Sequence, residues 1–252
     1  MPNSNLAFGI DLSRYNTSPD GKKKPNFDII AAHDPKVVFI AMRAGISWGY
    51  ADPWFNYYMQ EAKRINRIRL AYHVLYPGQP AQVQMDNLFR ILGDVDLDQI
   101  PLVLDCELHH NQTASRITSC ISSCVAILTK RTGRIPLIYS RAGWINQYVH
   151  VSHLPPVFWW LAQYRYSYPY PLSTPEYKSP PTLPRGVTSW TIHQTASRGR
   201  SIGAAAMYYM DYNRWNGTEK DALAFIGKTP QVALTCPIDK QPCPRLFEDD
   251  QD

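Results

Sequence analysis

The sequence predicts a single (β/α)8-type, or TIM-like, barrel that becomes irregular in its last third. Apolar stretches typical of buried strands alternate with stretches that carry a helical stripe of apolar residues. Five or more such units follow one another without an evident linker, and units of this length imply parallel strands joined by right-handed crossovers. An open doubly wound sheet is the second choice, because no G-x-G-x-x-G motif follows the first expected strand.

The first half of the chain contains the clearest elements. A strand over 6–15 ends in polar residues, and a second over 36–45 is nearly all apolar, as expected for a strand buried on both faces. Asp52 and Pro53 are the residue types of a helix N-cap and first turn, and an apolar helical stripe follows over 53–67. Strands at 68–77 and 100–108 are expected to flank a helix at 81–94.

The second half is less regular. A helix over 113–133 is expected to end at Gly133, followed by a strand at 135–141, a short helix at 142–149 and a strand at 156–164. Residues 164–187, rich in Tyr and Pro, are expected to form a long surface loop. Strands at 188–196 and 204–213 leave little room for a helix between them, and a helix at 218–228 closes the barrel. Residues 1–228 would thus form one domain, with 229–252 a poorly ordered tail.

Composition and charge fit a globular protein rather than a disordered chain. Apolar residues make up 44% of the 252 residues and charged residues 19%, while the net charge is +5. The only basic run, "GKKKPN" at 21–26, is interpreted as a solvated loop in preference to a polyanion site. The sequence shows neither a secretory signal nor an apolar run long enough to span a bilayer. We therefore expect a protein that stays in the cytoplasm until released or that leaves by a non-classical route.

Five cysteines are unevenly spaced and do not indicate a disulfide framework. Cys120 and Cys124 share a helix face at i,i+4, without a matching second pair that would complete a metal site. Cys236 and Cys243 could close a small loop if oxidised. Reduced, structural thiols are the preferred interpretation.

Two carboxylates, Asp105 and Glu107, stand at the end of the apolar run "IPLVLDCEL" (100–108). Side chains alternate along a strand, so both acids should point to one side while Cys106 points to the other. In a barrel, acids at the C-terminal end of a strand line the mouth, where active sites lie. Their Cβ atoms would be roughly 6–7 Å apart. This lies between the carboxylate spacings of retaining and inverting glycosidases and leaves the stereochemistry open.

Further acids follow other expected strands. Asp11 comes after the apolar residues of the first strand, and Asp211 lies with Asn213 at the end of the last one. Four carboxylates would then converge on one mouth, with Arg43 as a possible partner. Isolated buried acids are costly, so this convergence favours function over structure. Crowded acids also raise one another's pKa, which suits one of them to stay protonated as a general acid.

The sequence resembles the family 25 glycoside hydrolases, the Chalaropsis-type lysozymes. The matching segments, in family order over roughly residues 6–227, are "GIDLSRYN" (9–16), "FIAMRAG" (39–45), "AYHVLY" (71–76), "LVLDCEL" (102–108), "LIYS" (137–140), "WLAQY" (160–164) and "MDYNRWNG" (210–217). The Asp-x-Ser-x-Tyr start and the Asp-x-Asn-x-Trp-x-Gly end make the combination specific.

The resemblance implies an N-acetylmuramidase that cuts the β-1,4 bond between N-acetylmuramic acid and N-acetylglucosamine in bacterial peptidoglycan. By match to the family motif, Glu107 would be the general acid, and Asp105 would stabilise positive charge at the sugar carbon or through the substrate's acetamido group. Asp11 and Asp211 would position substrate and tune the pair. This chemistry needs no metal or other cofactor. The expected partner is cell-wall peptidoglycan, with neither nucleic acid nor membrane insertion, and the oligomeric state is not determined by the sequence. By analogy with the family, a chain without an export signal is expected to be a phage lysis enzyme or a virion-associated one.

Aromatic and amide side chains near strand ends are candidate sugar contacts. They are Tyr76, Tyr139, Trp160, Gln163, Tyr164 and Asn213. Only one of Trp159 and Trp160 can face the barrel interior, and His73 is interpreted as a core histidine. The chain departs from the family at "HQTA" (193–196), where a Trp-Gln-Tyr run is common, so one sugar subsite is expected to differ.

Two other functions are compatible with part of this pattern. A non-catalytic glycan-binding or structural barrel domain would keep the groove, but it would not need both Asp105 and Glu107. A metal-dependent barrel hydrolase would need His pairs at strand ends, and the adjacent pair His109 and His110 lies past its strand in a polar turn.

Overall fold

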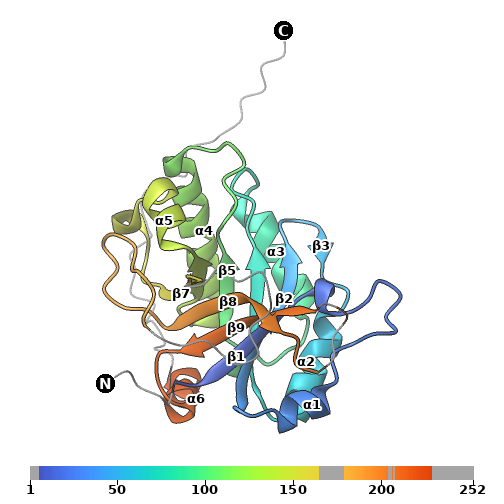
Figure 1. The fold of residues 1–252 in the computed structure, drawn as a ribbon. Coiled ribbons are helices and arrows are strands. Elements are labelled where there is room, and N and C mark those ends of the chain that lie inside the picture. Colours follow the sequence, from blue (N-terminus) through green and yellow to red (C-terminus); the bar gives the residue numbers. More distant parts are fainter. Residues whose placement is uncertain (1–5, 165–178, 204–205, 207, 229–252) are drawn as a thin grey trace.

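The computed structural model describes residues 6–164, 179–203, 206 and 208–228, and its centre is a closed barrel of eight strands (Figure 1). The ring closes because β1 pairs with β2 as well as with β9, and a two-residue strand, β3, extends the β2 edge as a hairpin. The strands are β1 Phe8–Leu12, β2 Val37–Ile46, β3 Tyr50–Ala51, β4 Ile68–Val74, β5 Leu102–Asp105, β6 Leu137–Ser140, β7 Phe158–Ala162, β8 Ile192–Arg200 and β9 Tyr209–Trp215. The barrel expected from the sequence is therefore present.

The strand directions correct one expectation. From β1 round to β8 the neighbouring strands run parallel, whereas β9 is antiparallel to both β8 and β1. The physical reason is the short connection between β8 and β9, since a parallel pair requires a crossover of a dozen or more residues. The antiparallel strand also brings the beginning of β9, rather than its end, to the mouth of the barrel.

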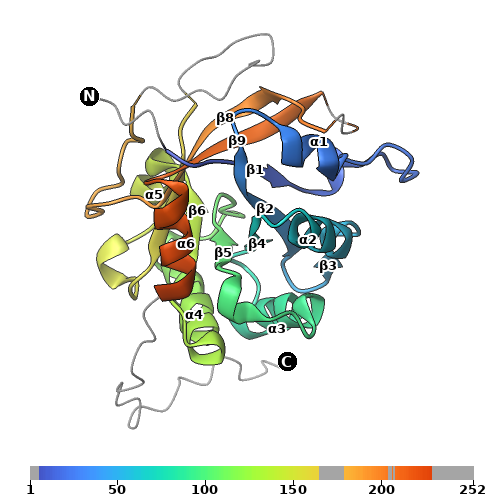
Figure 2. The same cartoon turned by 90° about the horizontal axis from the view of Figure 1, so that it is seen from below.

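Helices surround the barrel, as the end-on view in Figure 2 shows. They are α1 Phe27–Ala32, α2 Phe55–Arg64, α3 Ala81–Leu92, α4 Ala114–Thr132, α5 Ala142–Tyr148 and α6 Glu219–Lys228. All but α1 correspond to helices expected from the sequence; α1 and the hairpin strand β3 were not predicted. None of the described helices has the length and apolar character needed to cross a membrane.

Local signals explain where some helices begin and end. The Thr113 side chain accepts a hydrogen bond from the Arg116 N–H at the start of α4, and Gly133 ends the helix in the left-handed conformation at φ 67°. The prediction that Asp52 is the N-cap of α2 was wrong, because Trp54 occupies that position. Asp52 Oδ1 accepts a hydrogen bond from the Trp54 N–H, whereas Asp52 Oδ2 accepts one from the buried Arg43 Nε.

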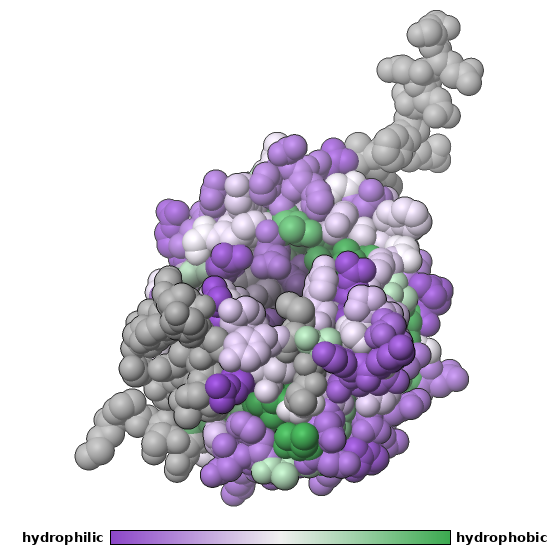
Figure 3. Space-filling view, turned by 45° about the vertical axis from the view of Figure 1, so that its right-hand side comes forward, coloured by the Kyte–Doolittle hydropathy of each residue, from purple (hydrophilic) through white to green (hydrophobic). Residues whose placement is uncertain are grey.

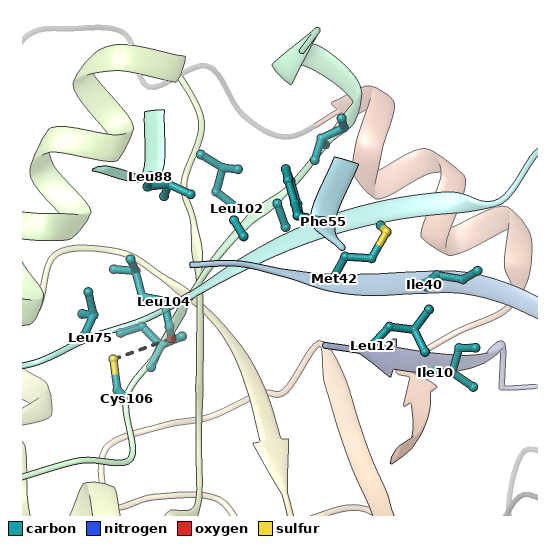
Figure 4. Packing of buried hydrophobic residues seen from close by; sticks show 14 of the residues in the cluster. Ile10, Leu12, Ile40, Met42, Phe55, Leu75, Leu88, Leu102, Leu104 and Cys106 are labelled. Carbon is teal, nitrogen blue, oxygen red and sulfur yellow. Dashed lines mark hydrogen bonds between the residues drawn. The ribbon is translucent and has the colours of Figure 1, made fainter. Parts of the chain in front are cut away.

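The strands alternate between two apolar cores. Residues that point outward pack under the helices, as Ile10, Leu12, Ile40 and Met42 do in Figure 4. Cys106 joins this outer core, as expected for the residue between Asp105 and Glu107. The other buried cysteines of the described chain, Cys120 and Cys124, are also free thiols. The predicted 236–243 loop, the 229–252 tail and most of the 164–187 loop lie outside the described residues.

The inner core fills the barrel from its lower end. α6 covers that end, where Trp215 makes edge-to-face contacts with Phe39 and Phe225 at ring-centroid distances of 5.6 and 5.1 Å. Gly9 is needed here, because a Cβ at this position would lie 2.4 Å from the Phe39 ring. The apolar filling leaves the opposite end, at the C-terminal edges of the parallel strands, for polar side chains.

Candidate active site

Three aspartates from three strands meet at the C-terminal end of the barrel, in a region that we call the pit. Asp11 on β1 lies directly opposite Asp211 on the antiparallel β9, and Asp105 is the last residue of β5. Each belongs to the inward-facing set of its strand. Asp11 and Asp105 are only 7% and 6% exposed, whereas Asp211 is partly exposed. The convergence of these acids was expected, but Asp211 is the third residue of β9 and not at its end as predicted, because β9 continues to Trp215.

Two amides hold the Asp11 carboxylate. Its Oδ2 accepts hydrogen bonds from Gln194 Nε2 at 2.9 Å and from Asn213 Nδ2 at 2.8 Å. Both amide side chains are buried, so these bonds form away from water. Asp11 therefore has a fixed orientation at the bottom of the pit.

Aromatic donors in turn fix the two amides. The hydroxyls of Tyr139 and Tyr164 both donate to Gln194 Oε1 at 2.7 Å, and Trp160 Nε1 donates to Asn213 Oδ1 at 2.9 Å. Trp160 faces the interior, while Trp159 packs outward. Four of the residues predicted to contact sugar, Tyr139, Trp160, Tyr164 and Asn213, thus act in this network, and Trp160 is buried.

Burial raises the pKa of both Asp11 and Asp211. The desolvation of Asp211, followed by the charge of Asp11 and a hydrogen bond with it, raises the pKa of Asp211 well above its ordinary value. Burial also raises the pKa of Asp11, although its hydrogen bonds from Asn213 and Gln194 oppose the shift. A protonated Asp211 that donates to an ionised Asp11 satisfies both carboxyl groups, with one negative charge between them.

Burial and three neighbouring charged groups affect the pKa of Asp105. Burial raises its pKa well above the ordinary value, and the carboxylates of Glu107 and Asp11 raise it further, while Arg43 acts in the opposite direction. Its Oδ1 is buried and has no hydrogen-bond partner among the described residues. An unsatisfied buried carboxylate oxygen is costly, so its presence calls for a functional explanation.

Glu107 differs from Asp105 in its access to solvent. It lies two residues beyond the end of β5, its side chain is 35% exposed, and its Oε2 is 3.7 Å from Arg141 Nη2. Glu107 and Arg141 line one wall of a groove of about 720 Å³, with Gln163 and Tyr164 on another. Figure 3 shows a shadowed hollow near the centre of the view, with hydrophilic side chains along much of its rim.

Arg43 is the cation that acts on Asp105. Residues 39, 41 and 43 of β2 alternate inward, so the guanidinium of Arg43 reaches the pit above Phe39 and Ala41. Arg43 Nε donates to Asp52 Oδ2 at 2.9 Å in a buried ion pair. Its Nη2 is buried without a hydrogen-bond partner in the described part of the chain.

The remaining predicted contacts are placed less uniformly. Gln163 lines the groove, but its Oε1 accepts from the Thr182 N–H at 2.6 Å. Tyr76 packs against His110 at 4.2 Å between ring centroids, outside the hydrogen-bond network of the pit. His73 is a core histidine as expected: burial lowers its pKa to about 4, and Nε2 lies 2.8 Å from the Ser47 carbonyl oxygen.

Sequence reasoning missed several residues of the site. Gln194 connects Asp11 to two tyrosines, Tyr72 lies within the electrostatic field of Asp11 and Asp105, and Arg141 faces Glu107. A signal for Gln194 was available, because it keeps the central residue of the Trp-Gln-Tyr run that the chain otherwise lacks. No group of three or more His, Cys, Asp or Glu side chains in the described ranges is arranged to hold a metal ion.

Comparison with known proteins gives this arrangement a family. The model of the glycosyl hydrolases family 25 matches residues 10–204, which include the end of β1 with Asp11, the Asp105–Glu107 segment and β8. The chain belongs to this family, and it is therefore a glycosidase whose acid-lined pit lies where the barrel architecture places active sites.

Individual relatives are distant. The uncharacterised protein YegX of Escherichia coli K12 is 26% identical over 234 residues, covering 90% of this chain and 75% of YegX. Lysozyme M1 of Streptomyces globisporus is 24% identical over 234 residues, covering 88% and 71%. The crystal structure of the lysozyme from Streptomyces coelicolor superposes with a TM-score of 0.71 at 21% identity, covering 90% of this chain and all of that one.

Proposed function

We propose that this glycosidase is an N-acetylmuramidase, which hydrolyses the β-1,4 bond between N-acetylmuramic acid and N-acetylglucosamine in peptidoglycan. Family membership and the likeness to lysozymes support this substrate. The observation that carries the proposal is the contrast between Glu107, accessible from a groove, and Asp105, buried two residues before it. Hydrolysis of a glycoside by two carboxyl groups requires such a pair.

Glu107 is assigned the role of general acid, because among the acids of the site it lines the groove in which a glycosidic oxygen can lie. Its proton passes to the leaving oxygen as the bond to the sugar carbon breaks. A bound saccharide covers the exposed part of Glu107 and removes its water.

Asp105 is assigned the stabilisation of positive charge. As the bond breaks, the sugar ring gains oxocarbenium character, and an ionised Asp105 favours that charge directly or through the substrate's acetamido group. Asp105 is 6% exposed, and its Oδ1 has no hydrogen-bond partner among the described residues. Asp11, which Gln194 and Asn213 hold, and Asp211 opposite it on β9 maintain the shape of the pit and the negative potential beside the reacting carbon.

Digestion of purified peptidoglycan, with identification of the released ends, tests the proposal. We expect new reducing ends of muramic acid, in an amount unaffected by a chelator. Glu107→Gln should lower kcat by about 10³-fold, within the range for loss of a general acid, while binding to the polymer persists. Glu219→Gln, the same change on the remote helix α6, is the matched control and should leave turnover unchanged.

The same digestion separates the alternatives. Glucosamine at the new reducing ends would contradict the muramidase assignment, and a wild-type protein that binds without cutting would support the glycan-binding domain instead. NMR in the first minutes shows the anomeric form of the product. A retained configuration indicates a covalent or acetamido-assisted route, and an inverted one indicates direct attack by water.

A further inference from the structure

A second, larger cavity lies on the other side of the pit from the Glu107 groove. Its volume is about 1030 Å³, and it lies between the segment after β1, the loop 17–24 and the start of α2. The lining residues include three cations, Arg14, Lys22 and Lys23, together with Tyr15 and Trp54. Nothing in the proposed chemistry uses this cavity, and its lining includes two of the three lysines of the basic run that sequence analysis interpreted as a solvated loop.

The loop that carries the lysines is structured. Ser18 N–H donates to the Lys23 carbonyl at 2.9 Å, the Lys23 N–H donates to Ser18 Oγ at 2.9 Å, and Ser18 Oγ donates to Asp20 Oδ1 at 2.5 Å. Gly21 turns the chain at φ 70°, where a Cβ would lie 2.8 Å from the Trp54 ring. The backbone therefore presents Lys22 and Lys23 at defined positions.

The three lysines of the run have different surroundings. Lys24 Nζ lies 4.8 Å from the centroid of the Trp54 ring and 4.9 Å from that of Tyr57, so its charge contributes to packing. Lys22 Nζ is 3.8 Å from Asp20, the one acid of the cavity lining. Lys23 has no carboxylate within ion-pair distance among the described residues. The cavity thus carries three cations against one carboxylate.

The cavity is connected to the pit through stacked side chains. The guanidinium of Arg14 lies 4.9 Å from the centroid of the Tyr15 ring, and that of Arg43 lies 5.4 Å from the same ring. Arg43 is the cation that acts on Asp105. The Tyr15 ring is therefore a contact that the cavity lining and Arg43 share. In Figure 3, which brings the side with the 17–24 loop forward, hydrophilic residues dominate the surface.

We propose that this cavity binds the carboxylates of the peptide stem that muramic acid carries. The inference rests on the proposed function. A muramic acid residue bound at the pit projects its lactyl-linked peptide away from the glycan chain, and stem peptides carry free carboxylates. The planar guanidinium of Arg14 and the mobile ammonium groups of Lys22 and Lys23 provide charge-assisted hydrogen bonds to such groups. The exposed ring of Tyr15 gives the stem an apolar surface.

Phosphate groups of anionic wall polymers are negatively charged like the stem carboxylates, but they are not covalently attached to the bound sugar. A stem carboxylate is tethered to the bound sugar, so its effective concentration at the cavity is high. A separate phosphate polymer would have to bind independently. The cavity therefore favours the substrate's own peptide.

The test compares two soluble substrates freed of phosphate polymers: glycan strands with uncrosslinked peptide stems, and strands stripped of their peptides by an amidase. For the variant Lys22→Gln/Lys23→Gln, the ratio of kcat/KM on peptide-bearing strands to that on bare strands should fall about fivefold at low ionic strength. This effect should diminish at 0.15 M salt, where screening shortens the range of charges to about 8 Å. Lys130→Gln/Lys220→Gln, which removes the same charge from exposed positions on α4 and α6, should leave the ratio unchanged.

Each outcome has a distinct meaning. An equal loss on both substrates, or an equal effect of the control pair, would overturn the proposal. Intact walls that keep their phosphate polymers serve as a third substrate, and an effect seen only on these walls would also overturn it. If the wild type cut neither substrate, the muramidase assignment would fail. Titration of Glu107→Gln with a soluble disaccharide–tripeptide and with the bare disaccharide would still test the cavity. A preference for the peptide form that the two lysine changes abolish supports the site, and equal affinities contradict it.

Discussion

The two ends of this barrel are built from the same strands but satisfy opposite requirements. At the lower end, Phe39 and Trp215 pack edge to face beneath α6, and every contact favours the folded state. At the upper end, the same two strands continue to Arg43 and Asp211, in a pit with two further aspartates. One strand can thus contribute packing at one end and charge at the other.

The difference shows where stability is gained and where it is lost. Burial raises the pKa of Asp11, Asp105 and Asp211, which means that their ionised forms are less favourable in the folded protein than in the unfolded chain. A network of amides and aromatic donors offsets this cost for Asp11, but Asp105 retains a buried oxygen without a partner. Strain of this kind is expected at functional sites and is tolerated because the opposite end is well packed.

The largest expected effect on stability concerns the lower end. Trp215→Ala removes a side chain that contacts Phe39 and Phe225, and the cavity should destabilise the protein by about 3–5 kcal/mol. The activity of the molecules that remain folded should change little, since Trp215 lies in the layer furthest from the acids. Urea unfolding and turnover below the transition measure the two quantities. A large loss of turnover at unchanged stability would contradict the division between the two ends.

An intermediate effect is expected where the ends meet, in the network around Asp11. Gln194→Met keeps the approximate shape but leaves Asp11 and the hydroxyls of Tyr139 and Tyr164 without their shared partner. The loss should be about 1–3 kcal/mol in unfolding free energy, together with a lower kcat/KM. Gln82→Met, the same substitution at an exposed position of α3, is the control. Equal behaviour of the two variants would show that the network does not support the site.

The packed end was the more predictable of the two. Strand and helix positions follow from apolar periodicity, and the alternation that places Phe39 and Ala41 inside the barrel also predicts that Arg43 points inward. The direction of β9 was missed, although the short stretch between the last two strands carried the information. Asp52 was misread because an N-cap and a buried ion-pair partner look alike in sequence.

The pit was predictable only in part. Strand ends identified the four acids, because carboxylates after apolar runs are rare and conspicuous. Their partners were harder to find, since Gln194 reaches Asp11 across a sequence separation of 183 residues and looks like any other strand residue. The basic cavity was dismissed as a solvated loop for a similar reason, because the sequence does not reveal that Arg14 and Trp54 lie beside the lysines.

The smallest expected effect is a gain in stability rather than a loss. It tests directly how much the buried acids of the upper end destabilise the folded protein. Asp211→Asn removes an acid whose pKa is raised in the folded protein, and the new amide can still donate to Asp11. At neutral pH the variant should be more stable, with a Tm higher by about 2–4 °C for each kcal/mol recovered. Its kcat/KM should fall, because the pit loses the proton that Asp211 shares with Asp11.

The pH dependence distinguishes this explanation from a general improvement in packing. An acid with a raised folded-state pKa holds its proton in the folded protein at pH values where the unfolded chain has released it, so its contribution to stability is lost as pH rises. The wild type and Asp211→Asn should therefore have similar stabilities near pH 4, close to the ordinary pKa of an aspartate, and diverge as pH rises towards 7. Thermal unfolding at both pH values measures the difference. A gain in Tm that is equal at pH 4 and pH 7 would mean that the charge of Asp211 does not oppose folding, and that the contrast between the two ends of the barrel has another origin.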